Sequence, residues 1–183
     1  MPDLHTYDII DIAAAKAVFA ARGTERTLRR GEYFCRMDRP VREIGIVLSG
    51  GFAFSHPDEK GHDQILSMAF DGEFVSAVVS HPDGSSMFDV RALCRSRITV
   101  MPQEQFFGCM EQKKTGFRAD LISGIAYGLL KRGICWRCET PEQRYATLLE
   151  RLPDIRKFVP MSDIAAWLGI TREAFSRMRS RNP

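Results

Sequence analysis

The sequence lacks the features that mark a membrane or exported protein. Its longest apolar run, near residues 125–130, is far too short to span a bilayer. The N-terminus has neither the basic start nor the apolar stretch of a secretory signal. The five cysteines are an odd number, which argues against a disulfide framework and for reduced thiols. These absences predict a soluble, cytoplasmic protein with no membrane partner.

The chain also has little net charge, +3 over 183 residues, but that charge is unevenly distributed. Residues 1–130 hold 15 basic and 17 acidic residues, whereas residues 131–183 hold 11 basic and 6 acidic ones. A basic C-terminal segment is typical of proteins that bind polyanions, although solvated basic faces are also common. The asymmetry therefore favours a nucleic-acid partner for the C-terminal part without requiring one.

What is present over residues 24–101 is a series of short β-rich runs separated by turn residues. The turns include Arg30-Gly31, Ser49-Gly50-Gly51 and Asp71-Gly72, and they recur roughly every 8–12 residues. The predicted strands are 33–35, 44–48, 52–54, 65–70, 88–93 and 98–101. This pattern predicts a small antiparallel sandwich or barrel, preceded by an alanine-rich helix over residues 8–21.

Residues 114–138 are predicted to form one long helix. Ile122, Leu129 and Trp136 recur every seven residues, with the small Ala126 and Gly133 between them. Such a stripe is typical of a seam between two helices, and the alternative is a face that packs on the β-rich part. We interpret it as a dimer seam, although Gly124, Gly128 and Gly133 weaken the helix.

A new helix is predicted to begin at Thr140. Thr140 can act as N-cap, Pro141 occupies the first helical position, and Gln143 can complete a capping box. Residues 138–139 are therefore interpreted as a hinge between two parts of the chain.

Residues 161–180 contain the pattern of a helix, a tight glycine turn and a second helix. Gly169 allows the positive φ that the turn needs, and Ala165 is small where the two helices cross. Thr171 is placed to cap the second helix. Ala174, Phe175 and Met178 share one face of that helix, and the opposite face is polar. The polar residues are Arg172, Glu173, Ser176, Arg177 and Ser180.

Side chains of these types can contact the edges of DNA bases. Arginine donates two hydrogen bonds to guanine, glutamate accepts from cytosine, and serine does either. The alternative is an ordinary amphipathic surface helix with a solvated charged face. Because the apolar positions, the small residue and the turn glycine all fit one motif, we interpret residues 161–180 as a DNA-reading helix-turn-helix.

At this point the chain resembles the CRP/FNR family of bacterial regulators over nearly its whole length. The resemblance rests on RRGEYF at 29–34, IVLSGGFAF at 46–54, FDGEFVS at 70–76 and TREAFSR at 171–177. It implies an α+β fold, with an N-terminal antiparallel β-roll of the cyclic-nucleotide-binding type (a double-stranded β-helix), a long dimerisation helix and a C-terminal helix-turn-helix. The implied domains are residues 1–113, 114–138 and 139–183.

The resemblance also implies partners and site residues. The partners are DNA carrying an inverted-repeat operator, a second copy of the chain, and RNA polymerase. The chain is expected to be no enzyme and to need no metal or other cofactor. The expected DNA-contacting residues are Thr171, Arg172, Glu173, Ser176, Arg177, Arg179 and Arg181. The residues expected around a ligand pocket are Gly72, Glu73, Phe74, Ala77, Ser86 and Met87.

Two departures from the family pattern stand out. Ala77 occupies the place of the glutamate that binds the ribose of a cyclic nucleotide, and Ser86 and Met87 occupy those of the arginine and serine that bind its phosphate. We therefore expect a degenerate pocket and no control by cyclic AMP. The sequence also ends directly after the second helix of the motif, so the wing hairpin found in many relatives is expected to be incomplete.

Two other classes of protein were weighed against this interpretation. A cupin-like metal enzyme or sensor would use His56, His62 and His81, but the first two flank a turn and lack the usual spacing on a strand. A stand-alone ligand-binding module would use its C-terminal helices only for protein contacts. Cys135 and Cys138 form a single Cys-x-x-Cys pair, which supplies half a metal site, and we interpret them as ordinary thiols.

Overall fold

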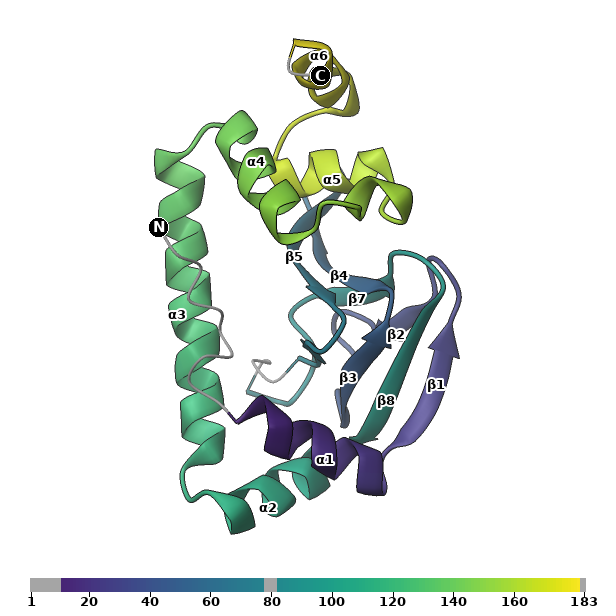
Figure 1. Ribbon diagram of the computed structural model, residues 1–183, viewed down its shortest axis with the longest axis vertical. Helices are drawn as coiled ribbons and strands as arrows, with labels where there is room; N and C mark the ends of the chain where they lie inside the picture. The colour runs from purple at the N-terminus through teal and green to yellow at the C-terminus, as the bar shows by residue number, and fades with distance from the viewer. Residues whose placement is uncertain (1–10, 78–81, 182–183) are drawn as a thin grey trace.

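The computed structural model describes residues 11–77 and 82–181. A short N-terminal helix precedes two antiparallel sheets, and the remaining chain is helical (Figure 1). The strands are β1 Thr24–Leu28, β2 Tyr33–Cys35, β3 Glu43–Ser49, β4 Gly51–Pro57, β5 Asp63–Phe70, β6 Phe74–Val75, β7 Asp89–Ala92 and β8 Ser96–Pro102. The helices are α1 Ile12–Arg22, α2 Gln103–Lys113, α3 Phe117–Cys138, α4 Pro141–Arg151, the 3₁₀ helix η1 Ile155–Lys157, α5 Met161–Leu168 and α6 Arg172–Arg181.

Each sheet has four strands, in the orders β1-β8-β3-β6 and β2-β7-β4-β5. Apolar side chains from both sheets fill the space between them, among them Val47, Phe52, Val90 and Ile98, with Phe54 packed edge-on against Phe88. The result is the predicted antiparallel β-roll, and the two sheets do not close into a barrel.

The three helices at one end of the β-roll share a second core. Asp11 caps α1 by accepting a hydrogen bond from the Ala14 amide at 2.8 Å. Phe19 of α1 stacks on Phe106 of α2, and Phe106 also meets Phe117 at the start of α3. This aromatic cluster fixes where α3 leaves the β-roll.

The structure differs from the sequence expectations in four elements. Strands β1 and β6 and helix α2 were not predicted. The long helix begins at Phe117 rather than at residue 114, because Gly116 adopts a left-handed conformation with φ of 85°. The carboxylate of Glu111 accepts hydrogen bonds from the free amides of Gly116 and Arg118, and these bonds hold the pKa of Glu111 below its usual value.

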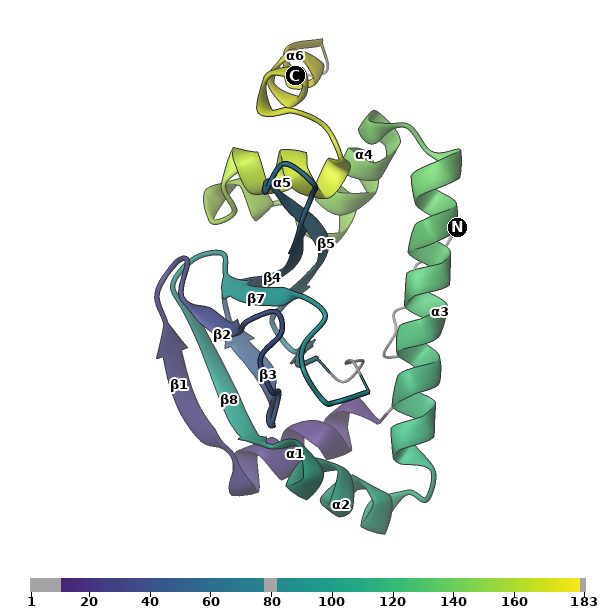
Figure 2. The same ribbon diagram turned by 180° about the vertical axis from the view of Figure 1, so that it is seen from behind.

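Figures 1 and 2 show the arrangement that follows. Helix α3 runs along one side of the molecule, from α2 at one end to α4 at the other. Helices α4 and α5 cover the end of the β-roll, and α6 lies beyond them, at the far end from α1 and α2. No helix in the described ranges is both long and apolar enough to cross a membrane.

Candidate functional site

The C-terminal helices form the predicted helix-turn-helix. Thr140 caps α4 with a complete capping box, in which its hydroxyl accepts from the Gln143 amide and the Gln143 side chain accepts from the Thr140 amide. Gly169 ends α5 at φ 70° and ψ 29°, a conformation that disfavours residues with a Cβ. The Thr171 hydroxyl then accepts from the Ala174 amide at 3.1 Å and so caps α6.

Helix α6 is divided into a buried and an exposed face. Phe175 is fully buried, with its ring edge-on to Tyr145 of α4, and Met178 is 7% exposed. On the opposite face Arg172, Glu173, Ser176 and Arg177 are all exposed, as predicted. The apolar contacts hold the helix in place and leave its polar face exposed. The helix itself lies at the end of the molecule (Figures 1 and 2).

Two other predicted DNA-contacting residues differ from this group. Arg179 is half-buried, and its guanidinium lies 3.2 Å from the Met161 Sδ atom. The side chain of Arg181 lies outside the described part of the chain. In Glu173, hydrogen bonds from its own backbone amide and from Thr171 hold the pKa of the carboxyl below its usual value, so this residue is an anion at neutral pH.

A clamp formed by Trp136 and Arg144 joins the end of α3 to the turn of the helix-turn-helix. The Arg144 guanidinium donates to the carbonyl oxygen of Glu139 at 2.6 Å and to that of Leu168 at 2.9 Å. Its Cζ atom also lies 5.1 Å from the centre of the Trp136 ring. The same ring covers Gly169, where a Cβ atom would lie 2.8 Å from it. The hinge at Glu139 and the turn at Gly169 are therefore held together.

Helix α3 carries an exposed apolar surface along its length, which we call the α3 face. Ile122 is 43% exposed and Leu129 56% exposed, as a seam requires. Leu130 and Ile134, which the heptad analysis missed, are even more exposed, at 71% and 62%. Trp136, the third predicted seam residue, is partly engaged in the clamp.

The residues predicted to surround a ligand pocket lie in and after the turn between β5 and β6 and in the segment before β7. Gly72 adopts φ of 84°, and its amide donates to Val47. Glu73 accepts from the Phe70 amide at 2.8 Å, while Phe74 and Ala77 are buried. The buried Ser86 hydroxyl donates to the Phe88 carbonyl at 2.6 Å, whereas Met87 is 42% exposed. Among the described residues of this predicted set, no cationic side chain stands at a phosphate position.

Comparison with known proteins identifies the β-rich part. The sequence pattern of the cyclic nucleotide-binding domain matches residues 25–113, which include all eight strands except the first residue of β1. Residues 25–113 are therefore similar to cyclic nucleotide-binding domains. A comparison of the sequence with curated proteins finds no match.

The fold of most of the chain matches that of several solved structures, among them bacterial regulators. FixK2 from Bradyrhizobium japonicum is 20% identical, with a TM-score of 0.71, and the match covers 87% of this chain and 84% of FixK2. A putative CRP/FNR-family transcriptional regulator from Eubacterium rectale is 15% identical, with a TM-score of 0.66, over 99% of this chain and 86% of that one. The c-di-GMP-responsive regulator CLP from Xanthomonas campestris is 15% identical, with a TM-score of 0.64, over 92% and 90%. The sequence-based expectation of this fold is thus confirmed.

The cyclic nucleotide-binding domain and the C-terminal helices share one hydrophobic core, which the sequence did not predict. Ile65, Met68 and Leu93 of the domain belong to the same buried cluster as Leu148, Ile164 and Phe175 of the helices. Arg91 of β7 reinforces the contact by donating to both carboxylate oxygens of Asp163 in α5, at 3.2 and 3.0 Å. Burial alone would lower the pKa of Arg91, but these hydrogen bonds and the charge of Asp163 raise it.

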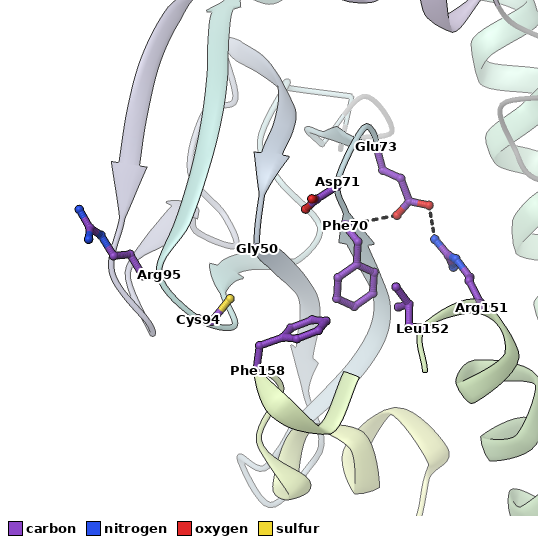
Figure 3. Close-up of a pocket in the computed structure, with 9 residues that line it drawn as sticks. All are labelled: Gly50, Phe70, Asp71, Glu73, Cys94, Arg95, Arg151, Leu152 and Phe158. Carbon is purple, nitrogen blue, oxygen red and sulfur yellow. Dashed lines mark hydrogen bonds and ion pairs between the residues drawn. The ribbon is translucent and has the colours of Figure 1, made fainter. Parts of the chain in front are cut away.

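Beside this shared core lies an open cleft of about 770 Å³ (Figure 3). The domain contributes Phe70, Asp71, Glu73, Cys94, Arg95 and the backbone of Gly50, and the C-terminal helices and their linker contribute Arg151, Leu152 and Phe158. Glu73 pairs with Arg151 across the junction, while Arg95 points away from the other side chains. We call this the junction cleft.

The residues weighed for metal binding are not brought together. His56 and His62 are both exposed beside the β4–β5 turn, and His81 lies outside the described residues. In the described ranges no three histidine, cysteine, aspartate or glutamate side chains are placed to hold one metal ion. None of the described cysteines forms a disulfide, and burial raises the pKa of Cys35 to about 11.

Proposed function

We propose that the chain is a sequence-specific DNA-binding transcriptional regulator of the CRP/FNR type, which acts as a homodimer and not as an enzyme. The observation that carries the proposal is α6, whose exposed Arg172, Glu173, Ser176 and Arg177 stand opposite a fully buried Phe175. A helix anchored in this way can enter the major groove with its polar face toward the base edges.

The helix also stands where DNA can reach it. It lies at the end of the molecule, beyond α4 and α5, and no other element lies beyond it in either view (Figures 1 and 2). Arg177 and Arg172 would donate to guanine and Glu173 would accept from cytosine, while Thr171, Ser176, Arg179 and Arg181 would contribute polar or phosphate contacts.

The exposed α3 face supports the same proposal, because it offers a surface for dimerisation. An exposed stripe formed by Ile122, Leu129, Leu130 and Ile134 is costly to leave in water, and a second copy of α3 would cover it. A two-fold axis along α3 would place two α6 helices at the same end of the dimer, and the operator would be an inverted repeat.

This arrangement suggests a separate role for each of the three parts of the chain. Residues 1–113 would serve as the sensor, residues 114–138 as the dimerisation helix and hinge, and residues 139–183 as the DNA-binding part. Such a regulator would work in the cytoplasm and would affect transcription by its contacts with RNA polymerase. Cyclic AMP would not control it, because Ala77, Ser86 and Met87 offer no counter-charge for a phosphate.

The test is a binding-site selection from a random DNA library with the purified full-length chain. The proposal predicts enrichment of an inverted repeat whose half-site centres lie about one helical turn apart, or a multiple of it. A library that stays unenriched, while the protein is folded and dimeric, would favour instead a stand-alone sensor module without DNA binding.

A further inference from the structure

Cys135 and Cys138 lie on the last turn of α3, beside the hinge that leads to the helix-turn-helix. The sequence pattern alone favours ordinary thiols, because a single Cys-x-x-Cys supplies only half a metal site. The structure adds that both residues belong to one continuous helix, which ends at Cys138. Residues three positions apart are neighbours on the surface of a helix, so the two side chains stand close together on one side of α3.

Arg132 stands one turn before Cys135 on the same helix. Its Nη2 atom donates to the Ser67 hydroxyl at 3.1 Å, and its Nη1 atom is buried with no partner among the described residues. Burial and repulsion from Arg151 lower the pKa of this guanidinium, while the charges of Glu73 and of a Cys135 thiolate act in the opposite direction. The attraction is mutual, so Arg132 favours the thiolate, which is the reactive form of cysteine.

The two thiols also differ in their access to solvent. Cys138 is exposed, whereas Cys135 is half-buried. Proteins in reducing compartments that sense oxidants combine an accessible cysteine with a second one that is poised to resolve it. An accessible thiol, one helical turn from a second thiol that a cation supports, has this arrangement.

We propose that Cys135 and Cys138 form a redox-active modification site, which hydroperoxides convert to a disulfide within the last turn of α3. The Cys138 thiolate attacks one oxygen of the hydroperoxide, the O–O bond breaks, and an alcohol or water leaves. The Cys135 thiolate then attacks the sulfur of the resulting sulfenic acid and displaces hydroxide, which takes up a proton to give water. In sum, two thiols and one hydroperoxide give a disulfide, an alcohol or water, and a second water.

This disulfide does not fit an undistorted helical turn. Residues three apart on a helix have Cβ atoms about 5–6 Å apart, whereas a disulfide requires about 3.5–4.5 Å. The turn can open because Cys138 is the last residue of α3 and Glu139 is already extended. Opening it strains the backbone hydrogen bond from the Glu139 amide to the Cys135 carbonyl oxygen, which measures 2.9 Å.

The strained turn is the one that carries the clamp. The carbonyl oxygen of Glu139 accepts from Arg144, and Trp136, which stands between the two cysteines in the sequence, covers Gly169. Oxidation therefore loosens the hold of α3 on the turn of the helix-turn-helix. Its effect on DNA binding rests on the proposed function, whereas formation of the disulfide does not.

The experiment treats the reduced full-length chain with tert-butyl hydroperoxide, blocks the remaining thiols with iodoacetamide, and digests the protein with trypsin without reduction. Cleavage after Arg132, Arg137 and Arg144 separates the two cysteines. A disulfide between them joins residues 133–137 to residues 138–144, and mass spectrometry should find this linked pair in most chains. Dithiothreitol should restore both thiols.

Variants and hydrogen exchange test the site and its consequence. Cys138→Ser should abolish the linked pair, and Cys109→Ser, which removes a half-buried thiol of α2, should leave it unchanged. Hydrogen exchange measured by NMR should show the Glu139 amide exchanging at least about tenfold faster in the oxidised chain. The Lys114 amide, which donates to the Met110 carbonyl at the end of α2, should exchange at its original rate.

Three results would overturn the proposal. The first is a Cys138 that stays reduced or proceeds to sulfinic or sulfonic acid without a linked pair. The second is a disulfide that joins two copies of residues 138–144, which would mean that Cys138 bridges two chains. The third is an exchange rate at Glu139 that oxidation leaves unchanged.

DNA binding by the reduced and the oxidised chain is measured separately. A reduced chain without affinity for DNA would contradict the proposed function and leave the dithiol site standing. Equal DNA affinity of the two forms would contradict the effect of the disulfide on the reading motif.

Discussion

At the scale of single residues, the contact between Trp136 and Gly169 decides how the reading motif sits on the long helix. Gly169 satisfies two requirements at once, since it adopts a left-handed conformation and leaves room for the Trp136 ring. Arg144 completes the clamp by binding the carbonyl oxygens on both sides, at Glu139 and Leu168. The turn pattern in the sequence predicted the left-handed conformation of Gly169. It could not predict the contact with Trp136, because that residue lies 33 positions earlier in the chain.

Replacing Gly169 by alanine should therefore destabilise the protein. The left-handed conformation costs an L-residue roughly 1–2 kcal/mol, and displacement of Trp136 adds to this, so we expect a loss of about 2–3 kcal/mol in the free energy of unfolding. Chemical denaturation measures it. The control is Gly108→Ala in α2, where an added Cβ meets nothing within 4 Å and a helical alanine should stabilise by about 0.5–1 kcal/mol. Equal effects at the two positions would contradict the clamp.

At the scale of the elements, two surfaces matter: the exposed α3 face, and the contact between α5 and the β-roll. The α3 face is apolar and exposed, whereas α5 is already seated on β5 through a shared core. Arg91 and Asp163 form an ion pair beside this α5–β5 contact, and their side chains are only 15% and 13% exposed. The first surface is proposed to bind another copy of the chain, and the second connects the two halves of one chain.

Leu129→Glu tests the α3 face. In a symmetric dimer the substitution would place two carboxylates close to the two-fold axis, and dimer affinity should fall on the order of 100-fold. Analytical ultracentrifugation over a concentration series measures this. Leu48→Glu on β3 replaces a leucine that is also exposed, at 39%, and should leave association intact. A Leu129→Glu chain that dimerises like the wild type would place the interface elsewhere.

Asp163→Asn tests the link between β7 and α5. It leaves the half-buried Arg91 guanidinium without its main anionic partner, and we expect a loss of roughly 2–3 kcal/mol in unfolding free energy. Asp154→Asn breaks an exposed ion pair with Lys157 and should cost less than about 0.5 kcal/mol. Comparable losses in the two variants, measured by urea denaturation, would show that the Arg91–Asp163 pair is not a special contact.

The elements themselves were predictable to different degrees. The strands with clear apolar runs, the capping box at Thr140 and the glycine turn at Gly169 were all confirmed. Strand β1 was missed because Thr24–Leu28 exposes four of its five residues, and β6 because it has only two. The shared core was missed because periodicity shows that Ile164 is buried in α5 without showing that β5 buries it.

At the scale of the whole molecule, the chain combines the fold of a cyclic nucleotide-binding domain with a predicted pocket whose residues include no arginine for a phosphate group. The Ser86 hydroxyl is already bound to the Phe88 carbonyl, and Met87 is exposed. The substituted pocket residues Ala77, Ser86 and Met87 could be recognised from the sequence. The junction cleft could not be predicted, because its lining residues lie far apart in the sequence, from Gly50 to Phe158, and only folding brings them together.

Cyclic AMP should therefore not bind at physiological concentration. A phosphate in the pocket would be desolvated without its bidentate arginine, which costs several kcal/mol. Isothermal titration of the full-length chain with cyclic AMP, and separately with cyclic GMP, should show no saturable heat. Micromolar binding of either nucleotide would mean that other residues supply the missing charge.

The central claim, that α6 reads DNA sequence, is tested most directly by repeating the binding-site selection with Arg177→Ala beside the wild type and Arg156→Ala. The account predicts the same inverted repeat for the wild type and for Arg156→Ala. For Arg177→Ala it predicts a relaxed base preference at one position of each half-site and a loss of roughly 1–3 kcal/mol in binding free energy on the wild-type site. An enriched motif that is unchanged in Arg177→Ala would contradict the assignment of α6 as the reading helix.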